Sequence, residues 1–242
     1  MNCLQFFPLW GEYLMSAEWK KPVSVAIDGP VGAGKSTIAR AVAEKMGFIY
    51  CDTGALYRSV GLFCVRDGAD LDSPYEIVRR LPHIGLKIRL VDGVQRVFLN
   101  EEDVSDKIRT ADISTAASKV SAVPEVRAAL LGIQRDIAKT ENVIMDGRDI
   151  GTVVLPDADV KIYLTASAEI RAKRRYDERI GKGAQVTYEE TLKDVNERDY
   201  RDMHREAAPL KRADDAIEAD TSELDFLQSV ELVCGIIRKS IE

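Results

Sequence analysis

A glycine-rich segment, Gly29-Pro-Val-Gly-Ala-Gly-Lys35-Ser36-Thr37, has the residue types needed to bind a polyphosphate. It matches the pattern G-x-x-x-x-G-K-[ST], in which the glycines let successive backbone N–H groups turn toward the phosphates. Lys35 supplies a mobile cation, and the Ser36 hydroxyl can coordinate Mg2+. An apolar run precedes the segment and a helix-like stretch follows it, so the positive end of a helix dipole also faces the phosphates. The segment therefore predicts a nucleotide-phosphate site rather than a structural turn.

Several arginines from separate segments are candidates to converge on this loop. Phosphoryl transfer between two nucleotides gathers many negative charges, and its catalysis depends mainly on positioning and cationic stabilisation. The candidates are Arg58, Arg127, Arg148, a stripe at helical spacing formed by Arg171, Arg174, Arg175 and Arg179, and a second stripe formed by Arg198, Asp202 and Arg205. The first stripe leads into Gly181-Lys-Gly183, which is typical of a mobile lid. The alternative for each stripe is a solvent-exposed helix face with weak i,i+4 ion pairs.

The order of elements predicts how these residues are brought together. Five short apolar runs indicate buried strands: Val23–Ile27, Phe48–Cys51, Val143–Met145, Val160–Leu164 and Ala216–Ala219. Helical patterns separate most of them, which favours an α/β fold with a five-stranded parallel sheet flanked by helices. Ligands bind such sheets beyond the carboxyl ends of the strands. Polar residues follow the five runs at Asp28, Asp52-Thr53-Gly54, Asp146–Asp149, Thr165 and Asp220.

One segment departs from this alternation. Residues 86–99 alternate between apolar and polar types on both sides of Asp92-Gly93, which predicts a type I′ β-hairpin. An antiparallel hairpin within an α/β chain indicates an insertion, here at about 82–109. The last segment, Ser222 to Ile241, has apolar residues every three or four positions and predicts a packed helix with Ser222 as its N-cap.

Composition narrows the classes of function. The chain has 242 residues and a net charge of -6, which argues against broad binding to nucleic acids. Its four cysteines form no C-x-x-C pair, so we expect reduced thiols and neither a zinc site nor a disulfide framework. We expect no membrane span, a cytoplasmic location and a monomer. Residues 1–21 lack a basic n-region and a cleavage site, so we interpret them as a frayed extension or a start assigned too early.

Five motifs together resemble those of the bacterial cytidylate kinases, a family of nucleoside-monophosphate kinases. They are Asp28-Gly-Pro-x-Gly-Ala-Gly-Lys35, Asp52-Thr-Gly-Ala-Leu-Tyr-Arg58, Glu102-Asp-Val-Ser-x-x-Ile-Arg109, Asp146-Gly-Arg-Asp-x-Gly-Thr152 and Glu197-Arg-Asp-x-Arg-Asp-x-x-Arg205. The third and fourth motifs are specific, whereas many proteins share the phosphate loop. The resemblance implies a P-loop domain at 22–242, with a β-rich monophosphate-binding insert at about 82–109 and a helical lid at about 171–187.

The resemblance also implies the reaction and its residues. ATP would donate its γ-phosphoryl group to CMP or dCMP in the presence of Mg2+, giving ADP and CDP or dCDP. The implied donor-binding residues are Gly29, Pro30, Val31, Gly32, Ala33, Gly34, Lys35, Ser36, Thr37 and Arg174, with Ser36 as the Mg2+ ligand. The implied acceptor-binding residues are Thr53, Arg58, Ser118, Arg127, Arg148, Asp149, Arg198, Asp202 and Arg205. The implied catalytic residues are Lys35, Arg148 and Arg205.

Base selection follows from the chemistry of Asp149, if it faces cytosine as the resemblance implies. A carboxylate accepts a hydrogen bond from the exocyclic amine of cytosine. Uracil has a carbonyl at that position, which would repel the carboxylate and leave buried groups unpaired, so CMP should be preferred over UMP. Asp146 has two open interpretations, as a carboxylate that orients Mg2+ through water and as a cap at the end of a strand.

Two other functions compete with this interpretation. Another small P-loop kinase, with a different monophosphate or a small alcohol as acceptor, would share the phosphate loop. A nucleotide-dependent switch would have no acceptor at all. Guanine-specific switches usually carry an N-K-x-D motif, which the chain lacks, and a switch would leave the acceptor-side arginines without a ligand.

Overall fold

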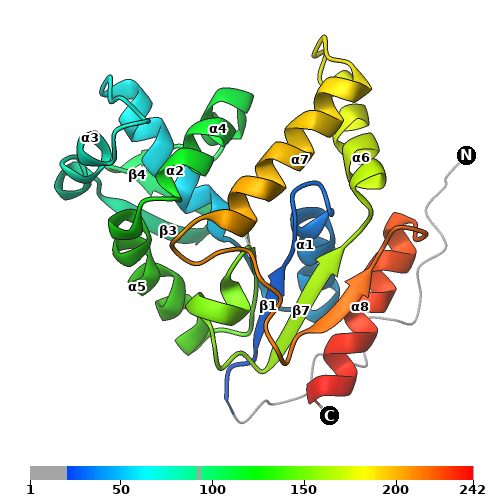
Figure 1. The fold of residues 1–242 in the computed structure, drawn as a ribbon. Helices are drawn as coiled ribbons and strands as arrows, with labels where there is room; N and C mark the ends of the chain where they lie inside the picture. The colour runs from blue at the N-terminus through cyan, green and yellow to red at the C-terminus, as the bar shows by residue number, and fades with distance from the viewer. Residues whose placement is uncertain (1–20, 92–93, 242) are drawn as a thin grey trace, which may run out of the picture.

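The computed structural model describes residues 21–91 and 94–241. Its larger sheet has five parallel strands in the order β2-β6-β1-β7-β8. Their bounds are β1 Ser24–Asp28, β2 Ile49–Asp52, β6 Val143–Gly147, β7 Val160–Thr165 and β8 Ile217–Asp220. The predicted α/β fold with a five-stranded parallel sheet is confirmed. Because β1 lies in the middle, the loop that follows it emerges at the centre of the sheet edge (Figure 1).

The strands extend beyond the apolar runs to include the first polar residue. Asp28 still pairs with Gly147, and Asp52 pairs with Asp146, so these aspartates belong to the ladder and not to the loops. The register places the carboxylates of Asp52 and Asp146 side by side at the carboxyl edge, where a ligand binds an open parallel sheet.

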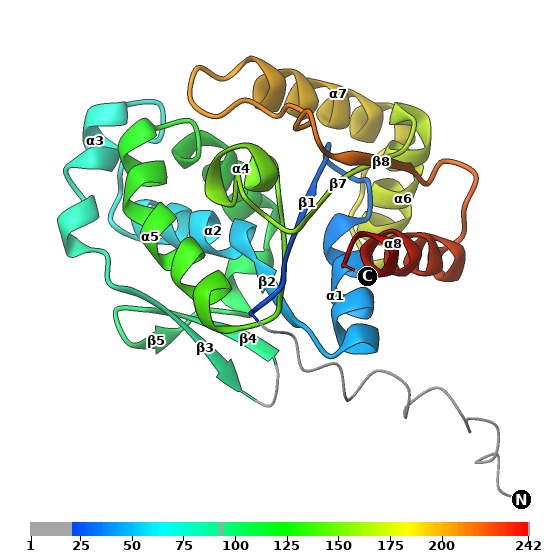
Figure 2. The ribbon, with the colours of Figure 1, turned by 90° about the horizontal axis from the view of Figure 1, so that it is seen from below.

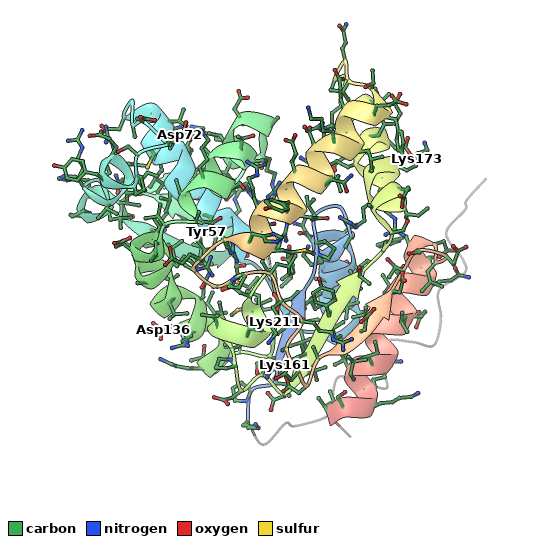
Figure 3. All side chains as sticks on the ribbon, viewed as in Figure 1. Tyr57, Asp72, Asp136, Lys161, Lys173 and Lys211 are labelled. Atoms are coloured by element: carbon green, nitrogen blue, oxygen red, sulfur yellow. The ribbon has the colours of Figure 1, made fainter. Side chains whose placement is uncertain are left out.

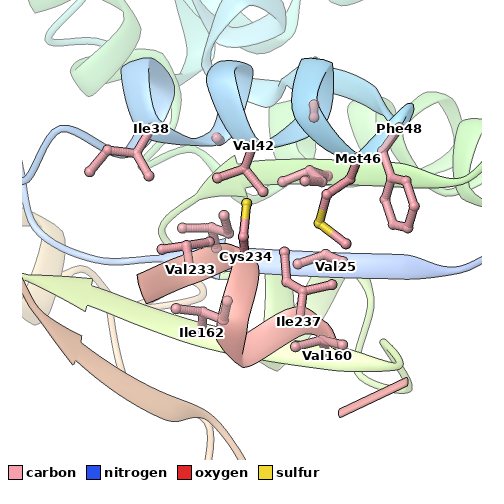
Figure 4. Packing of buried hydrophobic residues seen from close by; sticks show 14 of the residues in the cluster. Val25, Ile38, Val42, Met46, Phe48, Val160, Ile162, Val233, Cys234 and Ile237 are labelled. Carbon is pink, nitrogen blue, oxygen red and sulfur yellow. The ribbon is translucent and has the colours of Figure 1, made fainter. Parts of the chain in front are cut away.

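Helices cover both faces of the sheet, as Figure 2 shows from below. On one face, α1 (Lys35–Met46) and α8 (Phe226–Ile241) pack on alternate strand residues. Figure 4 shows this cluster, in which Cys234 and Ile237 of α8 contact the side chains of α1 and β1. On the other face, α5 (Pro124–Thr140) and the π-helical turn η3 (Ile150–Val154) cover the remaining strand residues. Cys51, Cys64 and Cys234 are buried free thiols, whereas Cys3 lies outside the described residues.

The helix predicted from Ser222 begins later, at Phe226. Asp225 caps it, because its Oδ1 accepts a hydrogen bond from the Gln228 N–H at 2.8 Å while the Gln228 side chain accepts one from the Asp225 N–H at 2.9 Å. Ser222 instead donates its hydroxyl to Asp220 at 2.6 Å and accepts from the Ser167 N–H at 2.9 Å. The prediction of Ser222 as the N-cap was wrong because a second capping residue lies three positions further along.

The insert forms a separate antiparallel sheet of three strands in the order β3-β4-β5. It packs with neighbouring helices around its own apolar core. The bounds of these elements are β3 Leu86–Val91, β4 Val94–Leu99, β5 Glu102–Asp103, α2 Thr53–Arg66, α3 Pro74–Val78, η1 Leu81–His83, η2 Lys107–Arg109 and α4 Ala111–Val120. The predicted hairpin is confirmed, but its turn at residues 92–93 and the extension at residues 1–20 lie outside the described residues.

Two antiparallel helices follow β7 and stand above the edge of the sheet (Figure 1). They are α6 (Ala168–Gly181) and α7 (Tyr188–His204). Each has a clear start, because Ser167 accepts a hydrogen bond from the Ile170 N–H at 3.3 Å and Thr187 forms a reciprocal capping box with Glu190. The connecting residues 182–187 contain Gly183 at φ +81°, a backbone conformation that favours glycine.

Candidate active site

A single cleft of about 1060 Å3 lies at the carboxyl edge of the large sheet, between α6–α7 and the α2–α4 side. This volume slightly exceeds the usual range for small-molecule sites, about 300–1,000 Å3. Most predicted site residues line it: Val31, Gly32, Gly34, Lys35, Ser36, Thr37, Thr53, Arg58, Ser118, Arg127, Arg148, Asp149, Arg174, Arg198, Asp202 and Arg205. Segments far apart in the sequence therefore converge as expected.

The three predicted loop residues that do not line the cleft shape the loop from behind. Gly29 has φ +152°, and a Cβ there would lie 2.0 Å from the Leu164 carbonyl oxygen, so a side chain is excluded. The Pro30 carbonyl accepts a hydrogen bond from Lys35 Nζ at 2.8 Å. Ala33 is 1% exposed and packs inside. These contacts fix the curvature that presents the backbone N–H groups to an anion.

Lys35 is the first residue of α1 and points back into the loop. Gly34, at φ +83°, supplies the turn before the helix, so unpaired N–H groups of the first helical turn face the cleft. The Lys35 side chain is buried, and its pKa lies well below the usual value because burial disfavours the ammonium and Arg148 repels it. A bound polyphosphate would add negative charge and favour the protonated lysine.

Ser36 and Asp146 form an oxygen-rich group beside Lys35. The Ser36 hydroxyl donates to Asp146 Oδ2 at 2.7 Å, and the Tyr50 hydroxyl donates to Asp146 Oδ1 at 2.8 Å. Burial and the neighbouring Asp52 raise the pKa of Asp146 above its usual value. A hydroxyl and a carboxylate are hard oxygen donors of the kind that Mg2+ prefers, so the residues present fit this ion.

Across the cleft, arginines are already paired with carboxylates. Arg58 Nη2 lies 2.5 Å from Asp52 Oδ2, and Arg148 Nε lies 2.8 Å from Asp202 Oδ2. Arg198 is crowded by other cations, and burial followed by repulsion from Arg148 lowers its pKa to about 10. Among the described residues, Nε of Arg58 and Nε of Arg198 are buried without a hydrogen-bond partner. Buried unpaired donors of this kind are suited to phosphate oxygens.

Asp149 lies between two of these guanidiniums. It is 4% exposed, pairs with Arg127 and lies 3.3 Å from Arg205 Nη2. Its loop is held from below by Asp28, whose two carboxylate oxygens accept the N–H groups of Ile150 at 2.8 Å and Gly151 at 2.7 Å. Burial raises the pKa of Asp28 to about 6. The start of the phosphate loop and the Asp149 loop are therefore joined through Asp28.

A family model described as "Cytidylate kinase" matches residues 25–239. The chain belongs to the cytidylate kinase family. It is 47% identical over 221 residues to a cytidylate kinase of Caldicellulosiruptor saccharolyticus, which covers 91% of this chain and 98% of that protein. It is 49% identical over 213 residues to a cytidylate kinase of Carboxydothermus hydrogenoformans, covering 88% and 96% of the two chains. The resemblance inferred from the five motifs is confirmed.

The similarity to solved structures is much weaker than the similarity to these two kinases. A shikimate kinase from Bacteroides thetaiotaomicron covers 89% of this chain and 98% of its own, with a TM-score of 0.45 and 14% identity. Within residues 21–91 and 94–241, no helix has the length and apolar character needed to cross a membrane.

For this member of the cytidylate kinase family, the first arginine stripe does not act as one surface. Arg171 points away from the cleft, is 7% exposed and pairs with Asp199. Arg179 pairs with Asp194 of α7 at 2.8 Å. Of the stripe, Arg174 and Arg175 line the cleft, and Arg174 donates to the carbonyl oxygen of Thr221 at 2.7 Å. The expectation that all four arginines converge on the phosphate loop was wrong for Arg171 and Arg179, because a helix packed on two sides presents its residues to different neighbours.

The residues of the second stripe, Arg198, Asp202 and Arg205, do not pair with one another either. Asp202 does not bridge Arg198 and Arg205 of its own segment, because its carboxylate accepts from Arg148 Nε across the cleft. Arg205 lies just past the end of α7, where its Nε donates to the Ala208 carbonyl at 2.7 Å and its Nη2 faces Asp149. Spacing located these three side chains correctly in the cleft, but their partners come from other segments.

Other residues in the cleft were not among the predicted site residues. They include Arg40, Tyr57, Arg109, Lys182, Leu224, Asp225 and Phe226. Tyr57 is labelled in Figure 3, and the guanidinium of Arg127 lies 5.4 Å from the centre of its ring. Arg109 and Tyr57 are part of the quoted family motifs, which could have identified them. Phe226 is 48% exposed, and no pattern in the sequence separates it from the apolar face of α8.

Proposed function

We propose that this chain transfers the γ-phosphoryl group of ATP to CMP or dCMP, giving ADP and CDP or dCDP. The observation that carries the proposal is one cleft in which the phosphate loop faces arginines and carboxylates from at least four other segments. Because the chain belongs to the cytidylate kinase family, we infer that this cleft would hold a donor and an acceptor nucleotide end to end. The donor terminus and the acceptor phosphate would meet near Lys35.

On the donor side, we assign the ATP phosphates to the backbone of Gly29–Thr37 and to Arg174. Lys35 would stay close to the phosphoryl group during its transfer. Because Lys35 is the first residue of α1, its ammonium lies within the loop. Ser36 would hold Mg2+, with Asp146 behind it through their hydrogen bond. When bound, Mg2+ would neutralise charge that develops between the β- and γ-phosphates.

On the acceptor side, we assign the monophosphate to Thr53 and Arg58 at the start of α2, which follows β2, and to Arg148, which follows β6. The buried unpaired Nε of Arg58 supports an anionic ligand there. Asp149 would accept the cytosine amine, with Ser118 and Arg127 beside the base. Arg198 and Asp202 would lie near the sugar, and Arg205, together with Arg148, would stabilise charge on the phosphoryl group in transit.

A panel of acceptors tests this proposal. Purified protein with ATP and Mg2+ is assayed against CMP, dCMP, UMP, AMP and shikimate. We expect the highest kcat/KM for CMP or dCMP, and a clear deficit for UMP because its carbonyl faces Asp149. Faster turnover of AMP or shikimate would refute the assignment of Asp149 to cytosine and support another small P-loop kinase.

A single-turnover assay separates a kinase from a nucleotide switch. Labelled ATP is incubated with the protein alone and with CMP. A kinase consumes ATP rapidly only when CMP is present, whereas a switch hydrolyses ATP slowly whether or not CMP is added. A monomer and a cytoplasmic location stay predictions, which size-exclusion chromatography and cell fractionation would test.

A further inference from the structure

One residue of the phosphate loop is held by the helices above the sheet and not by the loop itself. The N–H of Val31 donates to Asp199 Oδ1 of α7 at 3.0 Å. The carbonyl of Val31 accepts from Arg171 Nη1 of α6 at 2.9 Å. Arg171 and Asp199 pair directly with each other, and both are 7% exposed. Both backbone groups of Val31 are therefore satisfied by one buried ion pair.

Packing strengthens this attachment. The side chain of Val31 is 5% exposed and lies in a small apolar cluster with Ala172 of α6 and Val195 of α7. A Cβ at Gly32 would lie 2.9 Å from the carbonyl oxygen of Arg171, so the loop fits closely against α6. The loop, α6 and α7 are thus packed as one unit at this point.

The same helix reaches the other half of the cleft. Asp202 lies three residues after Asp199 on α7 and accepts from Arg148 Nε at 2.8 Å. Arg198, the neighbour of Asp199, lines the cleft on the acceptor side. One helix therefore contacts the donor loop through Asp199 and Arg148 of the acceptor side through Asp202, while its Arg198 lines the cleft.

We propose that Arg171 and Asp199 are positioning residues that couple the donor and acceptor sites, with α7 as the connecting element. The inference rests on the proposed function and adds a pair that touches neither nucleotide. A ligand on the phosphate loop orders Val31, and through the ion pair it orders α7. The second ligand then binds to residues that are already positioned, so it loses less conformational freedom. Such coupling is reciprocal, so CMP must strengthen donor binding by the same factor.

Calorimetric binding of CMP tests the coupling directly. The dissociation constant is measured without donor and with a saturating non-hydrolysable ATP analogue plus Mg2+. For the unaltered protein we expect the analogue to tighten CMP binding by a factor within the usual range for coupled sites, about 5- to 150-fold. A factor of one in the unaltered protein overturns the inference.

Two substitutions weaken the pair to different degrees. Asp199→Asn keeps a carbonyl oxygen for the Val31 N–H but removes the charge that holds Arg171, and we expect the factor to fall close to one. Arg171→Lys keeps a charge for Asp199, but an ammonium lacks the planar fork that reaches both Val31 and the Ala166 carbonyl. We expect an intermediate factor, which also serves as the test if Asp199→Asn does not fold.

Asp67→Asn is the control. It removes the same type of charge from a carboxylate that pairs at 2.7 Å with a largely buried arginine, Arg80, far from Val31 in the sequence; Asp67 is 55% exposed and Arg80 also pairs with Glu76. We expect this variant to keep the coupling factor of the unaltered protein. An unchanged factor in Asp199→Asn, or an equal loss in Asp67→Asn, overturns the inference. Turnover of CMP without coupling would refute only the inference, whereas absence of CMP binding to the unaltered protein would refute the proposed function.

Discussion

The donor and acceptor halves of the cleft are built in opposite ways. Apart from Arg174 of α6, the donor half comes from one continuous segment, Gly29–Thr37, and presents mainly backbone N–H groups and one lysine. The acceptor half comes from the ends of β2 and β6 and from α2, α4, α5 and α7, and presents side chains. The first is defined by local conformation, whereas the second exists only when distant segments fold together.

The two halves also differ in how their charges are held before a ligand arrives. Lys35 donates only to a backbone carbonyl, whereas Arg58, Arg127 and Arg148 are each paired with an aspartate. The carboxylates orient the guanidiniums and reduce repulsion among them. A monophosphate must therefore share or replace these partners, which makes the acceptor half sensitive to the loss of an aspartate as well as of an arginine.

The largest effect is expected at the single lysine of the donor half. Lys35→Ala removes the cation beside the phosphoryl group, and the neighbouring backbone cannot replace it. We expect kcat with saturating ATP and CMP to fall about 10²–10³-fold, which is the loss typical for one transition-state donor. A steady-state assay of ADP formation measures it, and a loss below tenfold would contradict the role.

Asp28, which joins the two halves, should give the protein a distinctive pH dependence of stability. Its native pKa of about 6 exceeds the usual value of 3.8, so between these values the folded protein binds the proton more tightly than the unfolded chain. Stability is therefore lost as pH rises from about 4 to 6, by up to about 3 kcal/mol at 1.36 kcal/mol per pKa unit. Urea unfolding at several pH values measures the change.

Asp28→Asn is the comparison for that experiment, because an amide does not titrate in this range. We expect the free energy of unfolding of the variant to change less steeply between pH 4 and 6 than that of the unaltered protein. Equal pH profiles for the two proteins would show that Asp28 does not carry the effect. The difference in slope, and not the stability at one pH, is the informative quantity.

A smaller effect is expected for base choice in the acceptor half. Asp149→Asn can donate to the uracil carbonyl, so the preference for CMP over UMP in kcat/KM should fall at least about tenfold, the equivalent of one buried unpaired group. The KM for CMP should rise while the KM for ATP changes little, since the donor loop is intact. An unaltered CMP preference would remove Asp149 from base recognition.

The smallest effect is expected on the outer face of α6, where Lys173 projects away from the cleft in Figure 3. It pairs with Asp177 at 2.5 Å, and the two side chains are 60% and 56% exposed. Lys173→Ala should cost about 0.3–0.5 kcal/mol, as for other exposed i,i+4 pairs. Urea unfolding measures this loss, and kcat/KM for CMP should stay within about twofold. A larger loss of activity would place Lys173 with the phosphate-binding residues.

The accuracy of the sequence predictions followed the range of the interactions involved. The phosphate loop, the five strands and the hairpin depend on neighbours in the chain, and all were found with small shifts at their ends. The strand ends moved because Asp28 and Asp52 still pair with a neighbouring strand, which a local apolar pattern does not record. The start of α8 moved because two residues could cap it, and only Asp225 is matched by Gln228.

The partners of the arginines could not be predicted from sequence spacing. Helical spacing placed Arg171 and Arg174 on one face, but a single helix turn separates a buried structural guanidinium from one that lines the cleft. Asp202 lies between Arg198 and Arg205 in the sequence, yet it pairs with Arg148. The pairing of these charges depends on how α6 and α7 pack against each other and against the loop after β1.

The amino-acid order alone specified the donor loop, the parallel sheet and the kinase family, because these follow from local conformation and from motifs of fixed spacing. Only the folded chain decided how the acceptor arginines are paired and that Val31 is held by Arg171 and Asp199. The physical reason is that a buried charge requires a partner, and packing in three dimensions selects that partner from distant segments.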